Sequence, residues 1–287
     1  MGRLSLVAAV AAAATAACAH VPAAPDPAPI VAAERAFAAE TGRIGVDRGF
    51  LNHSAPDAIM INSGVSRTHD ALNRDAPVAP PQPSLFWFPI WAGIARSGDL
   101  GFTSGPVEFG GRRGGTYFTI WRRQPDGSWK WVYDGGLGAS SANDPGPDSQ
   151  PLYLPPARVG AASAEAAMAE VRAAEAALAA QAGSDQQAAH LFYYAPAGRL
   201  HVAGHPPART PEAVRSLLAA YPPILRFAPP LGGGASAGGD LVWTYGRVTG
   251  EGGARLDGHF VHVWQKQAPG WRLVFSQILT GERPPSP

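Results

Sequence analysis

The chain is poor in cysteine, in lysine and in charge, and each shortage excludes a class of structure. Cys18 is its single cysteine, so no disulfide bond can form within one molecule. Lysine occurs only at Lys130 and Lys266, charged residues make up 16% of the 287, and the formal net charge is +1. A protein dedicated to nucleic acid normally presents a basic face, so this composition argues against nucleic acid as a partner.

The N-terminus has the pattern of an export signal. Arg3 supplies a positive start, and the apolar run of residues 4–17 is too short to span a bilayer as a helix. Ala17-Cys18-Ala19 has the small residues of a signal-peptide cleavage site, which would release a soluble protein beginning near His20. Residues 15–18, Thr-Ala-Ala-Cys, also resemble a bacterial lipobox, which would be cleaved before Cys18 and lipidated on its thiol.

The lone cysteine favours lipidation at Cys18, because an exported protein seldom leaves one thiol without a role. Each buried CH₂ of an acyl chain contributes about 0.8 kcal/mol, so several chains anchor a protein firmly. Residues 20–29 are rich in proline and predict an extended tether. The residue after Cys18 is Ala19 and not the Asp that is associated with retention of lipoproteins in the inner membrane. By this resemblance we expect an exported bacterial outer membrane lipoprotein facing the periplasm, or a soluble periplasmic or secreted protein if Cys18 carries no lipid.

A β-hairpin motif dominates the folded part of the sequence. Residues 115–134 read GTYFTIWRRQPDGSWKWVYD, two runs of β-branched and aromatic residues joined by Pro125-Asp126-Gly127, which is typical of a turn. Residues 258–276, GHFVHVWQKQAPGWRLVFS, repeat this pattern around a second Pro-Gly turn. The repetition indicates an internal duplication.

The two halves align at a nearly constant offset. Ala33-Glu34 matches Ala174-Glu175, an offset of 174 − 33 = 141, and Asp99-Leu100 matches Asp240-Leu241 at the same offset. Further matches are Gly42 with Gly183, Thr103 with Thr244, Gly105 with Gly246, Trp121 with Trp264 and Trp129 with Trp271. Self-similarity at a fixed period indicates two copies of one structural unit.

Each copy predicts a long Ala-rich helix, a short strand, a short helix and then an antiparallel set of strands. In the first copy, apolar residues recur every seven positions from Ile30 to Leu51, and Gly42 predicts a kink. The predicted boundaries are a signal peptide over 1–19, a tether over 20–29, a first domain over 30–135, a linker over 136–160, a second domain over 161–281 and a tail over 282–287.

The first copy resembles the NTF2-like superfamily, and most closely its SnoaL-like (DUF4440) branch. The segments that carry the resemblance are AERAFAAETGRIGVDRGFL, DAIMI, WAGIARSGDLGFTSGPVEF and TYFTIWRRQPDGSWKWVYD. The second copy keeps GGDL, the strand with Trp264 and the final Trp271. The resemblance implies an α+β fold of two tandem cones, each a curved antiparallel sheet packed on a long N-terminal helix, often around an apolar cavity. It also implies that the copies pack as an internal pseudo-dimer, because related folds commonly dimerise through their open sheets.

Asp134 is the one weak catalytic candidate. An isolated carboxyl in an apolar cone can acquire a raised pKa and act as a general acid or base. The more ordinary interpretation, which we prefer on sequence alone, is that Asp134 ends a strand and faces water. Alternation along the strands places Tyr117, Thr119 and Trp121 on one face, and sets Trp131 with Tyr133 opposite Asp134.

A ligand pocket of aromatic and hydroxyl side chains is the other candidate. The residues proposed to line it are Trp91, Tyr117, Thr119, Tyr245 and His262. The histidines of the second copy have no spacing typical of a metal site, because His259 and His262 lie three apart on a strand and point to opposite faces. We therefore expect no metal and no cofactor, and no nucleophile-elbow, phosphate-loop or zinc-protease motif is present.

The sequence favours non-catalytic binding of a small apolar or amphipathic molecule by an exported protein. The alternative is a SnoaL-like enzyme of isomerase or hydrolase type that uses Asp134 or a cavity histidine as acid or base. A further alternative is a protein-interaction module whose cavities are filled with side chains. The fold leaves all three open, because one fold serves many functions.

Overall fold

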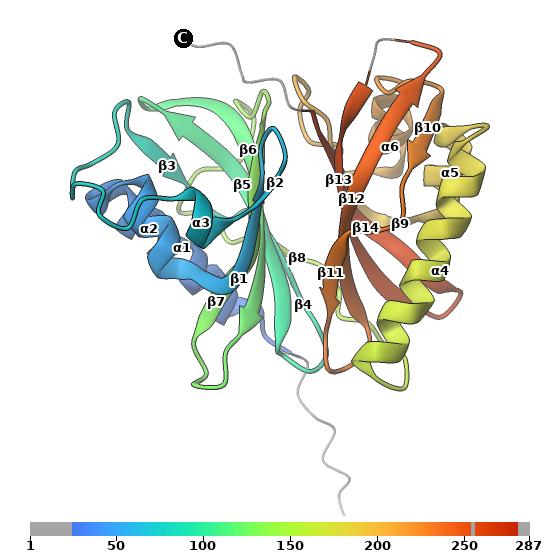
Figure 1. Cartoon of the computed structure of the whole chain (residues 1–287), viewed down its shortest axis with the longest axis horizontal. Helices are drawn as coiled ribbons and strands as arrows, with labels where there is room; N and C mark the ends of the chain where they lie inside the picture. The colour runs from blue at the N-terminus through green and yellow to red at the C-terminus, as the bar shows by residue number, and fades with distance from the viewer. Residues whose placement is uncertain (1–24, 254–255, 281–287) are drawn as a thin grey trace, which may run out of the picture.

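The computed structural model describes residues 25–253 and 256–280. It is an α+β structure with two separate sheets, whose strand orders are β2-β1-β7-β6-β5-β4-β8, with β3 paired to β5, and β10-β12-β13-β14-β9, with β11 paired to β12. The two sheets stand back to back in the middle, and the long helices α1 and α4 cover their outer sides (Figure 1). Each sheet with its helices is called a unit below. The export signal with Cys18, the first half of the predicted tether (residues 20–24) and the predicted tail over 282–287 lie outside the described residues.

The first unit follows the predicted order of elements. Its helices are α1 (Ala28–Ile44), α2 (Val46–His53) and α3 (Thr68–Ala71), and its strands are β1 (Ser54–Ile61), β2 (Val65–Arg67), β3 (Leu85–Trp87), β4 (Trp91–Ile94), β5 (Leu100–Phe109), β6 (Arg112–Arg123) and β7 (Trp129–Gly138). Ile30, Phe37 and Ile44 are all buried, as their seven-residue spacing predicts. The helix breaks at Gly45, at φ 96°, and not at Gly42.

The second unit repeats this plan after the linker strand β8 (Leu152–Tyr153). Its helices are α4 (Ala164–Ala182), α5 (Gln186–Tyr193) and α6 (Pro211–Leu218), and its strands are β9 (Tyr194–His201), β10 (Ile224–Phe227), β11 (Gly232–Ala235), β12 (Leu241–Glu251), β13 (Leu256–Gln267) and β14 (Gly270–Thr280). Val171 and Leu178 of α4 are fully buried. Both units therefore build a core between one long helix and one sheet.

A β-bulge in the closing hairpin overturns simple alternation along β7. Trp131 pairs with Trp121 but Tyr133 pairs with Ile120, so Val132 is an extra residue on its strand. As a result Trp131 and Asp134 face the helix side of the sheet, where Trp131 meets Phe37. Tyr133 faces the other unit, so the expectation that it shares a face with Trp131 was wrong. The second hairpin has the same irregularity between Val263 and Trp264.

The two sheets contact each other through the faces that point away from the helices. Phe118 of β6 stacks on Phe275 of β14 with ring centroids 3.5 Å apart. The amide Nε2 of Gln277 donates to the hydroxyl of Tyr133 at 2.6 Å. Apolar residues from both sheets join in one buried cluster around these contacts. This packing leaves the helix side of each sheet as the interior of its own unit.

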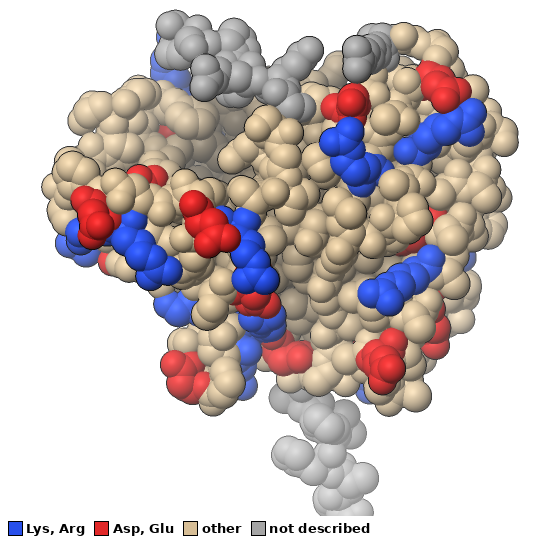
Figure 2. All heavy atoms as spheres, viewed as in Figure 1, with Lys and Arg blue, Asp and Glu red and all other residues tan. Residues whose placement is uncertain are grey.

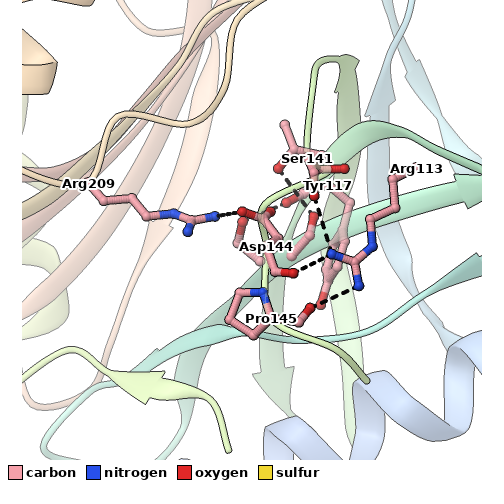
Figure 3. Close-up of polar contacts among 9 residues, drawn as sticks. Arg113, Tyr117, Ser141, Asp144, Pro145 and Arg209 are labelled. Atoms are coloured by element: carbon pink, nitrogen blue, oxygen red, sulfur yellow. Dashed lines mark hydrogen bonds and ion pairs between the residues drawn. The ribbon is translucent and has the colours of Figure 1, made fainter. Parts of the chain in front are cut away.

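The segment between the units is held by arginines of both. The guanidinium of Arg113 on β6 donates to the backbone carbonyls of Ser141, Asp144 and Pro145, and Arg209 of the second unit pairs with the carboxylate of Asp144 (Figure 3). Further on, β8 pairs in parallel with β4. The linker predicted over 136–160 thus contains the end of β7 and a short strand of the first sheet.

Acidic and basic side chains are interspersed on the face shown in Figure 2, without a large area of one sign. Within the described residues, no helix combines the length and the apolar character needed to cross a bilayer.

Candidate functional sites in the two cones

A buried glutamate of α1 anchors the helix to the first sheet. Glu34 has no solvent exposure. Its carboxylate accepts hydrogen bonds from the indole nitrogens of Trp87, at 2.6 Å, and Trp121, at 3.0 Å, and from the hydroxyl of Thr103. Burial of a carboxylate is tolerated only where donors surround it, and three donors from three strands do so here.

Glu175 of α4 has the same place in the second unit. It accepts hydrogen bonds from Thr244, at 2.5 Å, and from Trp264, at 2.7 Å. The ring nitrogen Nδ1 of His262 lies 3.0 Å from its carboxylate. Glu34 and Glu175 are equivalent at the offset of 141, as are Thr103 and Thr244. The sequence comparison matched these positions but did not identify either glutamate as a site residue; a carboxyl repeated on the apolar face of both helices was the available signal.

The two buried carboxyls differ in their proton affinity. Burial raises the pKa of Glu34, and its hydrogen bonds only partly oppose this. Burial acts in the same direction on Glu175, but the charge of His262 and the hydrogen bonds of His262, Thr244 and Trp264 outweigh it and lower the pKa. The first unit has Thr119 where the second has His262, so it lacks the counter-charge. At this position the first cone has a hydroxyl and the second has an imidazole, and the pKa values of the two carboxyls shift in opposite directions.

Asp134 points into the first cone beside Glu34. Its carboxylate accepts a hydrogen bond of 2.6 Å from Thr119 on the neighbouring strand β6. Burial raises the pKa of Asp134 well above its ordinary range, and the charge of Glu34 adds to this. Asp134 is thus half-buried on the helix side of the sheet and hydrogen-bonded to Thr119, and does not merely end a strand, because β7 continues to Gly138. The bulge at Val132 is the cause, because it turns Asp134 to the cone side.

Tyr117 lies on the same face of β6, two residues before Thr119. Its ring is 6.5 Å from that of Trp87, and the side chain is 5% exposed. Burial raises the pKa of its phenol, with a further contribution from Glu34. Its hydroxyl has no hydrogen-bond partner among the described residues. A buried hydroxyl without a partner is uncommon and marks a place where a ligand oxygen can bind.

His262 lies fully buried in the second cone beside His190. The rings are 6.4 Å apart, and neither Nε2 atom has a partner among the described residues. Burial lowers the pKa of His190 to about 4, so this imidazole is neutral near pH 7. Glu175 orients His262 through Nδ1. Because both rings are sealed from solvent, this pair is less accessible than Asp134, which is only partly buried.

Trp91 and Tyr245 lie between the sheets and not inside a cone. Trp91 packs on Phe102, and the guanidinium of Arg199 lies 4.3 Å above its ring. Tyr245 stacks on Trp243, and both line a cleft between the two units that is described below. The five predicted pocket residues are thus distributed over three places: Tyr117 and Thr119 in the first cone, His262 in the second, and the other two between the units.

No group of three or more metal-ligating side chains occurs among the residues that the structure describes. The carboxyls identified above are hydrogen-bonded to tryptophan, threonine or histidine side chains, and His190 is hydrogen-bonded through Nδ1 to the backbone carbonyl of Gln186.

Comparison with known proteins gives likeness at the level of the fold. No family model matches the chain, and no curated protein matches it. An NTF2-like protein of unknown function from Pseudomonas putida KT2440 is similar, with a TM-score of 0.34 and 14% identity over 41% of this chain and 88% of that one. A ketosteroid isomerase-like protein from Erwinia carotovora atroseptica has a TM-score of 0.32 and 16% identity over 40% of this chain and 96% of its own. An NTF2-like protein with a cystatin-like fold from Novosphingobium aromaticivorans has a TM-score of 0.30 and 18% identity, covering 41% and 84%. Each of these similarities covers about 40% of this chain.

Proposed function

We propose that the first unit binds a small, mainly apolar molecule that carries a carbonyl or hydroxyl oxygen. The observation that supports this most directly is the pair formed by Tyr117 and Asp134 on one face of the cone. One is a buried hydroxyl without a partner among the described residues, and the other is a carboxyl that accepts a single hydrogen bond. Binding sites for small molecules are mostly apolar with a few placed polar groups, which fits this arrangement.

The protonation state of Asp134 determines what it offers to a ligand. A carboxyl with a pKa well above its ordinary range holds its proton at higher pH, and the neutral acid donates as well as accepts a hydrogen bond. Tyr117 supplies a second donor. Two donors on the helix side of the sheet, with the ring of Trp87 6.5 Å from that of Tyr117, are suited to the oxygen of an otherwise hydrophobic molecule.

Acid–base catalysis is the second candidate function, and the closeness of Glu34 to Asp134 favours it. Two carboxyls that interact titrate as a pair, and one of them keeps its proton more strongly than an isolated group. Such a carboxyl could transfer a proton to or from a bound ligand. Binding is the more economical proposal, because it needs only the hydrogen-bond donors.

The test is a binding screen with matched variants. Small cyclic ketones and alcohols are titrated against the full chain, and binding is followed by intrinsic tryptophan fluorescence. The second unit has Phe260 at the position equivalent to Tyr117. The substitution Tyr117→Phe should weaken binding of the best compound about 3- to 10-fold, the loss expected for one hydrogen bond. Asp134→Asn should weaken it as well, whereas Ser276→Ala at the equivalent position should not. A screen without a binder, or a binder indifferent to Tyr117 and Asp134, would overturn the proposal.

For the cellular setting we propose an exported bacterial envelope protein, anchored through lipid on Cys18. The apolar N-terminal run and the lone cysteine support this. We also propose that the two units act as an internal pseudo-dimer. The stacking of Phe118 on Phe275 and the bond from Gln277 to Tyr133 support that arrangement.

A further inference from the structure

A cleft of about 290 Å³ lies between the two units, away from both cones. One wall is the glycine-rich strand β11 with Trp243 and Tyr245 of β12. The other wall comes from the first unit, where Ile59, Leu100 and Val132 provide apolar surface and Asp57, Asp99 and Arg122 provide charged groups. The cleft is continuous with the interface between the sheets, because Trp243 lies 6.1 Å from Tyr133. It is built by both units and needs both.

The internal duplication provides a second cleft for comparison. Strand β4 is the counterpart of β11: Trp91 pairs with Ser104, and Gly232 pairs with Tyr245, both related by the offset of 141. In the first unit, the outer edge of β4 is occupied by the linker. Leu152 and Leu154 donate their backbone N–H groups to the carbonyls of Ile90, at 3.0 Å, and Ala92, at 2.8 Å.

Side chains complete the filling of this equivalent cleft. Leu154 is 5% exposed and packs close to Gly93. The amide of Gln265 donates to the carbonyl of Pro155 at 2.9 Å, and Arg199 covers the ring of Trp91. An extended segment with one apolar side chain therefore occupies the cleft beside β4, and the stretch that precedes it is held at Asp144 and Pro145 by Arg209 and Arg113 (Figure 3).

Within the described parts of the chain, no strand and no leucine fills the cleft beside β11 in this way, although Arg122, the counterpart of Gln265, lines it and pairs with Asp57 at 2.6 Å. Gly232 is the counterpart of Trp91. Ile59 is the counterpart of Arg199, because Ile59 pairs with Tyr133 and Arg199 pairs with Phe275, and these two partners are equivalent. Among the described residues no strand pairs with the outer edge of β11, and the neighbouring Leu231 is 58% exposed. The carbonyls equivalent to those of Ile90 and Ala92 belong to Leu231 and Gly233. An unpaired strand edge is a template for strand addition, and the cleft beside it offers apolar surface from Ile59, Leu100 and Val132 next to a charged rim.

We propose that this edge and cleft bind an extended peptide segment of a partner protein, which adds in parallel to β11 as the linker adds to β4. Backbone N–H groups of the peptide donate to the carbonyls of Leu231 and Gly233. One apolar side chain enters the cleft between Trp243 and the wall formed by Leu100 and Val132. Main-chain hydrogen bonds supply affinity in this mode of recognition, and the side-chain pocket supplies specificity. The peptide site is separate from the small-molecule site in the first cone.

The probe is a labelled nonapeptide with the sequence of residues 149–157, SQPLYLPPA, which is the segment that fills the equivalent cleft. Fluorescence anisotropy with the full chain should give saturable binding. Replacing the second leucine of the peptide, the counterpart of Leu154, by aspartate should weaken binding at least about tenfold, as for loss of a buried anchor. Ile59→Arg should weaken it similarly, because arginine at the equivalent position covers the other cleft. Arg199→Ile should leave binding unchanged.

A second measurement uses only the wild-type chain, so its result does not depend on whether the Ile59→Arg variant folds. It is amide hydrogen exchange with and without the bound nonapeptide. The bound nonapeptide should protect amides of residues 232–235 and leave those of 91–94 unchanged. Failure of the peptide to bind, or binding without protection of β11, would overturn the proposal. Equal binding of the leucine and aspartate peptides would also overturn it.

Discussion

Asp134→Asn is expected to stabilise the folded chain near neutral pH and to have almost no effect in acid. Asparagine has the shape of aspartate, and its carbonyl can still accept the hydrogen bond from Thr119. What the substitution removes is the ionisation of a carboxyl that has one donor and the charge of Glu34 nearby. Thr119 is the one hydrogen-bond donor to this carboxyl among the described residues.

The sign follows from the direction of the pKa shift. Folding raises the pKa of Asp134, so the unfolded chain releases this proton at a lower pH than the folded chain. The contribution to stability is therefore complete below the unfolded pKa, about 4, and is lost as pH rises through the folded pKa. We expect Asp134→Asn to add about 1–3 kcal/mol near pH 7.5, the usual cost of an inadequately partnered buried polar group, and close to nothing below pH 4.

Urea unfolding followed by tryptophan fluorescence measures this difference at both pH values. Asp57→Asn is the matched control, because Asp57 is half exposed and paired with Arg122 at 2.6 Å. The hydrogen bond from Arg122 lowers the pKa of Asp57, so this variant should lose up to about 1 kcal/mol at neutral pH and nothing at low pH. Equal destabilisation by Asp134→Asn at both pH values would refute the assignment of Asp134 to the interior of the cone.

Three further predictions concern the second cone, the interface and the N-terminus. Glu175→Gln should cost about 3–5 kcal/mol near pH 7, because it leaves His262 and two other donors without their buried acceptor charge; a loss below 1 kcal/mol in urea unfolding would contradict this. Phe118→Ala should cost about 3–5 kcal/mol by opening a cavity against Phe275, whereas wild-type stability of this variant would speak against packing of the sheets. Cys18→Ser should move the protein from the membrane fraction to the soluble fraction, and mass spectrometry that finds an unmodified wild-type chain beginning near His20 would end the lipid-anchor proposal.

The α+β class and the order of elements could be predicted from the sequence because the same pattern of helix and strands occurs twice. A single Trp-bearing hairpin is ambiguous, but Trp121 and Trp264 on matching strands identify a repeated unit. The buried anchor was missed although Glu34 and Glu175 were aligned, because a helix pattern gives no information on the donors that meet it from the sheet. Those donors come from three strands far apart in the sequence, so only the folded chain brings them together.

The orientation of Asp134 was inaccessible for a more local reason. Alternation along a strand assumes an unbroken ladder, and one extra residue at Val132 reverses the side on which every later residue lies. Nothing in WKWVYD distinguishes a bulged strand from a regular one. The strand β8 was missed similarly, since a proline-rich segment becomes a strand only where an open sheet edge accepts it.

A crystal structure of the chain with the tightest-binding ketone or alcohol tests the proposed function most directly. The account predicts the ligand inside the first cone, with its oxygen within hydrogen-bond distance of the Tyr117 hydroxyl and the Asp134 carboxyl. A ligand bound in the second cone, or between the two sheets, would contradict it.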